Sequence, residues 1–407
     1  MGFSIFQLLP PLLIFLSTFF YQQTQAIKKP YIVYLGSHSH GLNPSSLDMD
    51  SATDSHYDLL SSVLGSHEKA KEAIFYSYNK HINGFAALLE EEEAEEIKKN
   101  KNVVSVFVSK MHKLHTTRSW AFLQQERNRR VNRNSAWKRG RFGQNTIIAN
   151  IDTGVWPESK SFSDKGYGGI PSKWRGGGIC QINNLPTSNK TLCNNKLIGA
   201  RIFNDGYKAL YGAIDPAHHN SARDIIGHGT HTLSTAAGNF VRGANVLGNG
   251  NGTAKGGSPR ARVASYKACW DPSDEGGCVE ADLLAAFDQA ISDGVDVLSV
   301  SVGAHKEFPE SLLTDGISIG AFHAVAKGVV VVCSAGNQGP KFGTVKNVAP
   351  WSFTIGASSI DREFSNNLTM SDGTIYKGIS LTTGLPDSLP LIRASDAKLP
   401  NATTQDA

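Results

Sequence analysis

Residues 145–154, NTIIANIDTG, decide the fold, because they have the pattern of a buried strand that ends on an acidic residue. Three further apolar runs follow along the chain. They are VDVLSVSVG (295–303), VVVVCSAGN (329–337) and WSFTIGAS (351–358). Amphipathic helical patterns precede the first two of these runs, which indicates a parallel α/β sheet covered on both faces. The functional residues of such a sheet are expected at the carboxyl ends of its strands.

The region before this sheet shows a different, compact alternation. The expected strands are residues 31–36, 74–79, 84–89 and 103–110, and the expected helices are residues 50–64 and 91–100. Asn83-Gly84 is typical of a tight turn between the middle two strands. The order βαββαβ predicts a ferredoxin-like α+β domain with both helices on one face of the sheet. That fold alone names no function.

The composition is that of a globular protein, with 40% hydrophobic and 19% charged residues among 407, which argues against disorder and against a membrane bundle. The length suits two domains, or two and the beginning of a third. A formal net charge of +4 predicts no nucleic-acid or membrane partner. Residues 127–141 are a local exception, with seven basic residues and no acidic one. We interpret this run as a solvated loop between domains, with a polyanion-binding patch as the alternative.

Residues 1–26 are expected to be a secretory signal peptide, because an apolar stretch ends at a polar segment and the small residue Ala26. An uncleaved anchor is the alternative. No later stretch is apolar and long enough to cross a bilayer. In a secreted protein, four Asn-X-Ser/Thr sequons would be acceptors for N-linked sugars, and we expect some of them to be glycosylated. They begin at Asn189, Asn251, Asn367 and Asn401.

All five cysteines lie beyond residue 179, and secretion would place them in an oxidising compartment. The simplest pairing is local. Cys180 with Cys193, and Cys269 with Cys278, would each close a short loop and add about 2 to 3 kcal/mol of stability. Cys333 then remains, and its apolar surroundings favour a buried, unreactive thiol over a nucleophile.

Three polar residues lie where the sheet pattern places chemistry. Asp152 ends the first strand. His228 lies between two glycines in DIIGHGTHTLSTAAG (224–238), where the small neighbours let an imidazole base approach other backbone closely. Asn337 ends the run 329–337, and its amide could donate to a developing oxyanion. Turn residues are the alternative for Asp152 and Asn337, and a metal pair is the alternative for His228 with His231, disfavoured because no third ligand of the usual kind lies nearby.

The motifs around these residues resemble those of the subtilase family of serine proteases. They are IDTGVWPES (151–159), GHGTHT (227–232), SVSVG (299–303) and SAGNQG (334–339), in the family's order. DTGVWPES and HTTRSW (115–120) resemble the plant branch in particular, and residues 30–115 resemble its inhibitory propeptide. The resemblance implies a signal peptide at 1–26, a propeptide at 27–115, a subtilisin-like catalytic domain at 116–384 and the start of a protease-associated insert at 385–407.

The resemblance also implies roles for single residues. Asp152 would orient the imidazole, His228 would act as general base and then acid, and Asn337 would donate to the tetrahedral intermediate, which are the roles worked out for subtilisin itself. Two backbone segments would bind the substrate. Ser301, Val302 and Gly303 would pair with its extended chain, and Ser334, Ala335 and Gly336 would line the pocket for the residue before the cut. The implied partners are a protein or peptide substrate and the chain's own propeptide, in the extracellular space or cell wall, with no cofactor, metal, nucleic acid or membrane.

One part of the family's pattern is not found. The nucleophilic serine of the family lies in a GTSMS-like motif downstream of the Asn, and no Gly-Thr-Ser occurs in these 407 residues. We therefore expect an incomplete catalytic domain that has no peptidase activity as written and does not cleave its own propeptide. We also expect this domain to be poorly stable by itself, because the missing helix would leave apolar surface exposed.

Two other hypotheses about function were compared with the sequence. GISIG (316–320) matches the nucleophile elbow of another hydrolase fold, with Ser318 at its centre. A helix pattern without a preceding strand, and His323 as the only later histidine, disfavour that hypothesis. The second alternative is a non-catalytic product in which residues 30–115 act in trans as a protease inhibitor or folding chaperone. Reading the transcript past codon 407 would distinguish that product from a protease.

Overall fold

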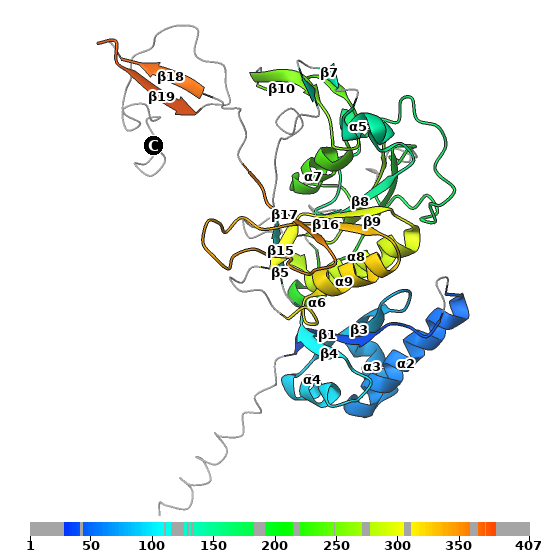
Figure 1. Ribbon diagram of the computed structural model, residues 1–407. Helices are drawn as coiled ribbons and strands as arrows, with labels where there is room; N and C mark the ends of the chain where they lie inside the picture. Colours follow the sequence, from blue (N-terminus) through cyan, green and yellow to red (C-terminus); the bar gives the residue numbers. More distant parts are fainter. Residues whose placement is uncertain are drawn as a thin grey trace, which may run out of the picture.

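The computed structural model describes residues 28–40, 44–109, 111–114, 126–127, 130–131, 134–182, 192–214, 220–247, 249–270, 277–304, 311–358, 365–370 and 372–379. The predicted signal peptide, the predicted insert at 385–407 and two predicted glycosylation sites, Asn189 and Asn401, lie outside these residues. Figure 1 shows a smaller N-terminal domain packed against one end of a larger α/β domain. Among the described residues, every helix is too short or too polar to span a bilayer.

The N-terminal domain is a four-stranded antiparallel sheet with strand order β2-β3-β1-β4, the ferredoxin-like order that the sequence predicted. Its elements are β1 (Lys29–Gly36), α2 (Ser46–Leu64), α3 (His67–Ala73), β2 (Ile74–Tyr78), β3 (Asn83–Leu89), α4 (Glu91–Lys98) and β4 (Ser105–Val108). The first helical region differs from the prediction. The helix α2 begins at Ser46, not at residue 50, because Ser45 and Asp48 form a capping box, and the extra helix α3 follows Gly65.

The two faces of this sheet bury different partners, because side chains alternate along a strand. Tyr31 and Val33 of β1 pack in one apolar cluster with α2 and α4. Ile32 and Tyr34 point to the other face and pack with α8 (Glu280–Asp293) of the α/β domain. The sheet therefore lies between its own helices and the α/β domain (Figure 1).

The core of the α/β domain is a six-stranded parallel sheet in the order β17-β16-β14-β8-β12-β9. Its strands are β8 (Ile147–Asp152), β9 (Leu197–Ile202), β12 (Arg262–Lys267), β14 (Val297–Val300), β16 (Val330–Ser334) and β17 (Phe353–Ile355). All four apolar runs that the sequence singled out supply strands of this sheet, so the prediction of a parallel α/β fold is confirmed.

Helices cover both faces of the parallel sheet. The odd-numbered residues of β8 pack with α8 and α9 (Gly316–Ala326), whereas Ile148 and Asn150 face α7 (His228–Ala237). Alternation therefore places Asp152, the last residue of β8, on the side of α7. The remaining elements are α5 (Ala136–Arg139), α6 (Asp205–Tyr211), the 3₁₀ turns η2 (Arg141–Gly143) and η3 (Lys160–Phe162), and the hairpins β6–β7 (Glu126–Arg127, Arg130–Val131), β10–β11 (Val241–Val246, Asn249–Ala254) and β18–β19 (Ser365–Thr369, Ile375–Ile379).

A small antiparallel sheet connects the end of the N-terminal region to the α/β domain. The strand β5 (Met111–Leu114) lies between β13 (Cys278–Val279) and β15 (Val302–Ala304). On one edge Gly303 pairs with Lys113, and on the other edge Cys278 pairs with His112. The backbone of a segment far upstream is thus held from both sides by the α/β domain.

Polar contacts join the N-terminal domain to α8. Tyr76 donates its hydroxyl hydrogen to Asp282 (2.7 Å), and the backbone N–H groups of His81 and Ile82 donate to Asp288. Burial raises the pKa of Asp282 to about 7 and that of Asp288 to about 6. The contact surface therefore contains carboxyl groups that titrate close to neutral pH.

Candidate active site

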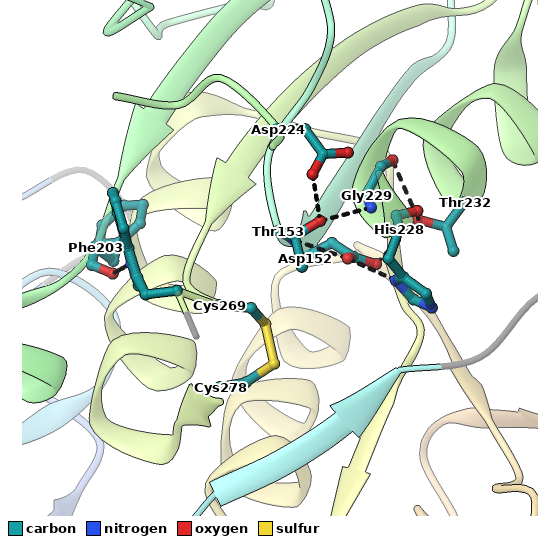
Figure 2. The surroundings of a disulfide bond; sticks show 10 residues. Asp152, Thr153, Phe203, Asp224, His228, Gly229, Thr232, Cys269 and Cys278 are labelled. Atoms are coloured by element: carbon teal, nitrogen blue, oxygen red, sulfur yellow. Dashed lines mark hydrogen bonds and ion pairs between the residues drawn. A yellow bond between two sulfur atoms is a disulfide. The ribbon is translucent and has the colours of Figure 1, made fainter. Parts of the chain in front are cut away.

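Asp152 and His228 meet at the carboxyl end of β8, where α7 begins (Figure 2). Asp152 Oδ1 lies 2.8 Å from His228 Nδ1. The carboxylate also accepts hydrogen bonds from the Thr153 N–H and the Thr232 hydroxyl, at 2.7 and 2.9 Å. The side chain of Asp152 is 1% exposed and that of His228 is 11% exposed. Because Nδ1 is held by the carboxylate, proton exchange with a reacting group falls to Nε2.

Close packing between α7 and the end of β8 brings the two side chains together. A Cβ atom on Gly229 would lie 2.4 Å from the carbonyl oxygen of Gly154 and 2.8 Å from its nitrogen, so a larger residue cannot fit without displacing the backbone. Gly227 caps the helix with a φ of 94°, a conformation that glycine adopts freely. The glycines on both sides of His228 therefore allow the close backbone approach that the sequence indicated.

Asp224 organises the loop that carries His228, and sequence reasoning missed it. Its buried carboxylate accepts five hydrogen bonds. The donors are the Thr153 hydroxyl, the Ile226 N–H, the Gly227 N–H, and the N–H and hydroxyl of Thr230. Thr153 in turn accepts from the Gly229 N–H at 2.8 Å. Figure 2 shows the Thr153 hydroxyl between the Asp224 carboxylate and the Gly229 N–H. This hydroxyl therefore links the residue after Asp152 to the residue after His228. An Asp three residues before a Gly-His-Gly sequence was the available signal, since such residues often cap backbone N–H groups.

The other candidate residues lie along the same edge of the sheet. The register aligns Ile151 of β8, Val300 of β14 and Cys333 of β16. The residues that follow them, Asp152, Ser301 and Ser334, therefore leave the sheet on neighbouring strands about 5 Å apart. Asn337 follows three residues after Ser334 and is exposed. Among the described residues, no hydrogen bond joins the side chain of Asn337 to the Asp152–His228 pair.

Asn347 is a second residue that the sequence did not single out. Its side-chain amide donates to the carbonyl oxygens of Val302 and Ser334, both at 2.8 Å. The residue has a φ of 54°, which asparagine tolerates better than most side chains. Asn347 thereby ties β15 to the end of β16, the two segments expected to contact substrate.

The structure also decides the cysteine and serine alternatives. Disulfides join Cys180 to Cys193 and Cys269 to Cys278, as expected. Cys333 is a buried free thiol whose pKa is raised to about 12 by burial, which fits an unreactive cysteine. Ser318 lies buried in the first turn of α9 and donates its hydroxyl to the capping residue Asp315. It is part of a helix start, so the nucleophile-elbow hypothesis is wrong.

A buried carboxylate that orients a histidine at the carboxyl edge of a parallel sheet is the arrangement of an α/β hydrolytic enzyme. Residues 143–393 match the Subtilase family, and residues 30–115 match Peptidase inhibitor I9. The chain belongs to the subtilase family of serine peptidases, with an N-terminal inhibitor domain of the I9 type.

Plant relatives match nearly the whole chain. Subtilisin-like protease Glyma18g48580 of Glycine max is 63% identical over 396 residues, which are 97% of this chain and 49% of the relative. Subtilisin-like protease SBT5.4 of Arabidopsis thaliana is 56% identical over 397 residues, 97% of this chain and 50% of the relative. The chain therefore spans about half the length of the curated relatives that it matches.

Proposed function

We propose that this chain carries the catalytic acid and base of a secreted serine endopeptidase that is made as an inactive precursor. One observation carries the proposal. The buried carboxylate of Asp152 holds Nδ1 of His228 at 2.8 Å, at the sheet edge where β15 pairs with the extended strand β5. A histidine held in this way can accept a proton on Nε2 while the carboxylate stabilises the resulting imidazolium.

The geometry supports an acyl-transfer mechanism. Nε2 of His228 would take the proton of a serine hydroxyl as its oxygen attacks the scissile carbonyl, and would then give the proton to the leaving amine. Asn337, exposed beyond β16, would donate its amide hydrogen to the oxyanion. The backbone of Ser301, Val302 and Gly303 would pair with the substrate, and residues 334–336 would line the pocket for the residue before the cut.

The nucleophile is proposed to lie outside these 407 residues. They contain no Gly-Thr-Ser, and the curated relatives are about twice as long as the region they share with this chain. The 407-residue chain alone is therefore expected to be inactive and unable to cut its own N-terminal domain away. We also assign residues 1–26 to secretion and the accessible sequons, Asn367 among them, to glycosylation.

The N-terminal domain is proposed to act as the propeptide. The strand β5, which follows this domain along the chain, pairs with Val302, Gly303 and Ala304, the backbone that we assign to substrate. The same edge therefore cannot pair with another peptide while β5 is bound. The match to Peptidase inhibitor I9 supports this role.

Peptidase activity of the longer protein tests the proposal directly. After removal of residues 28–114, a protein expressed past codon 407 should cleave an unfolded protein substrate. A serine-directed organophosphorus reagent should abolish cleavage. A metal chelator should not abolish it, because it does not react with the residues that carry out the chemistry. Cleavage that survives the serine reagent would sink the proposal.

The Cys269–Cys278 disulfide is predicted to hold β13 in the position where it pairs with a bound peptide strand. Cys269 donates its N–H to the carbonyl oxygen of Asp152, and Cys278 pairs with β5. Replacing both cysteines by alanine should release β13 and remove about 1 to 2 kcal/mol of backbone pairing, because one edge of the peptide strand loses its partner. We expect KM for extended peptides to rise about tenfold, with kcat nearly unchanged.

The Cys180–Cys193 disulfide supplies the matched control, since it closes a loop of similar length away from β5. Its removal should lower the unfolding midpoint and leave KM unchanged. Equal rises of KM in both double variants would show that the effect is one of general stability.

Binding of the propeptide is predicted to depend on pH through His323. This buried residue of α9 hydrogen-bonds the Tyr34 hydroxyl at 2.7 Å, and its pKa is lowered to about 4, first by burial and then by His38 and Lys327. A lowered histidine pKa keeps the neutral form in the complex, so the contribution of His323 to association is fully present above about pH 6.5 and is lost as the pH falls toward 4. Between pH 7 and 5 this group should weaken association by about 2 kcal/mol.

The substitution His323→Gln isolates this contribution, because glutamine keeps a hydrogen-bonding group and does not titrate. Asp282 and Asp288, whose pKa values are raised, act in the opposite direction, and both residues are present in both proteins. A cleavage site introduced between residues 115 and 125 separates the domains, and co-elution of the pieces measures association. The dissociation constant at pH 5 divided by that at pH 7 should be at least about tenfold smaller in the variant than in the parent. The exposed His67→Gln serves as control, and an unchanged ratio in H323Q would refute the prediction.

A further inference from the structure

A surface hollow of about 830 Å³ lies at the edge of the parallel sheet opposite to Asp152. Asn145, just before β8, and Arg262, the first residue of β12, both line it, which places it at the amino ends of these strands. Asp152 is the last residue of β8, about 17 Å further along the strand. The hollow is therefore separate from the proposed peptide-binding edge.

The lining of the hollow is positively charged. Five basic residues contribute to it, and no Asp or Glu does so among the described residues. The five are Lys160, Lys165, Arg242, Arg260 and Arg262. Arg262 is buried and donates to the carbonyl oxygens of Asn195, Gly168 and Gly169, so it builds the wall. The other four side chains are exposed, and in the described part of the chain no carboxylate forms an ion pair with them.

The basic run at residues 127–141 adjoins this hollow. Phe142, directly after the run, accepts a hydrogen bond from the Arg260 N–H and has its ring 5.7 Å from that of Phe240, which lines the hollow. Three described side chains of the run, Lys138, Arg139 and Arg141, are exposed on α5 and η2. Figure 1 shows α5 and β10 together at the end of the α/β domain farthest from the N-terminal domain. The two groups of cations therefore form one basic surface.

The other groups in the hollow indicate what kind of anion fits. Gln144 and Asn145 supply side-chain amides, which can bind hydroxyl groups. Phe240 is 42% exposed and offers an apolar ring face. Amides, an exposed ring and spaced cations match a chain of sugar units that carry carboxylates, because each unit has hydroxyls, an apolar C–H face and an acid group. A single phosphate would leave most of these groups unused.

We propose that this basic surface, formed by Lys160, Lys165, Arg242 and Arg260 in the hollow and Lys138, Arg139 and Arg141 beside it, binds an acidic polysaccharide built of uronic acid units. Binding at this edge leaves the proposed active site open, so the polysaccharide would hold the protein in place without competing with substrate.

Binding of the 407-residue chain to polygalacturonate tests the proposal. The test variant replaces the four hollow cations by glutamine, and the control variant replaces Lys71, Lys98, Lys99 and Lys101 of the N-terminal domain, which changes the net charge by the same amount. All substituted residues are exposed, and a matched thermal melt verifies folding. We expect the test variant to bind about tenfold more weakly or worse, the control to stay within about twofold of the parent, and affinity to fall between about 50 and 200 mM salt.

The competitors identify the ligand class. Fully methyl-esterified polygalacturonate should not compete, because its carboxylates are neutralised. Inorganic phosphate should weaken binding only as much as another salt of the same ionic strength does. Three results would overturn the proposal. They are equal losses in the two variants, competition by the methyl ester, and displacement by duplex DNA at equal charge concentration.

Discussion

Replacing His228 by alanine is expected to abolish peptidase activity in the protein expressed past residue 407. Asp152 holds the imidazole at Nδ1, so loss of the imidazole removes both the base for attack and the acid for release of the amine. In subtilisin, the worked case for this triad, loss of the histidine costs about a millionfold in kcat, and loss of the aspartate about 10⁴-fold. We expect costs of the same order for His228→Ala and Asp152→Asn, with KM changed little.

His231→Ala is the matched control for this prediction. The residue lies one helical turn after His228 on α7, so its replacement perturbs the same helix without removing a partner of Asp152. Rates within a few-fold of the parent are expected in steady-state assays. A variant lacking His228 that retained a tenth of the activity would show that another residue is the base.

Gly229→Ala is expected to separate the pair without removing either side chain. The new Cβ would meet backbone atoms of Gly154 at 2.4 and 2.8 Å and of Thr153 at 3.1 Å, so α7 must move away from β8. Overpacking of this kind costs about 3 kcal/mol, and a displacement of about 1 Å costs about 100-fold in rate. A urea titration and kcat should show both losses.

Gly169→Ala controls for the loss of glycine itself, since a Cβ there meets nothing within 4 Å. Its unfolding midpoint should match that of the parent. If Gly229→Ala were as stable and as active as Gly169→Ala, the close approach of α7 to β8 would not be what positions His228.

The positions of Asp152 and His228 could be predicted because local rules fix them. A buried strand that ends on an acidic residue points that residue to a sheet edge, and a histidine between two glycines marks a helix start with close backbone contact. The disulfides were predictable for a similar reason, since each pair is close in sequence. The start of α2 was misplaced because the capping box of Ser45 and Asp48 extends the helix beyond its apolar pattern.

Asp224 and Asn347 could not be predicted, because their function depends on backbone groups that only the tertiary fold brings within reach. Asp224 binds N–H groups of its own loop and the hydroxyl of Thr153, 71 residues earlier. The pairing of β5 with β13 and β15 joins segments that are more than 160 residues apart, and no periodicity in the sequence encodes it.

The central claim is that Asp152 and His228 form an acid–base pair for a serine hydroxyl. A fluorophosphonate probe, followed by peptide mass spectrometry, tests it most directly, because the probe labels only serines that an adjacent base activates. The account predicts one labelled serine, beyond residue 407, in the longer protein freed of residues 28–114, and no label in the 407-residue chain or in the His228→Ala variant. Labelling of Ser318 or of any other serine within these 407 residues, or labelling that persists without His228, would contradict the account.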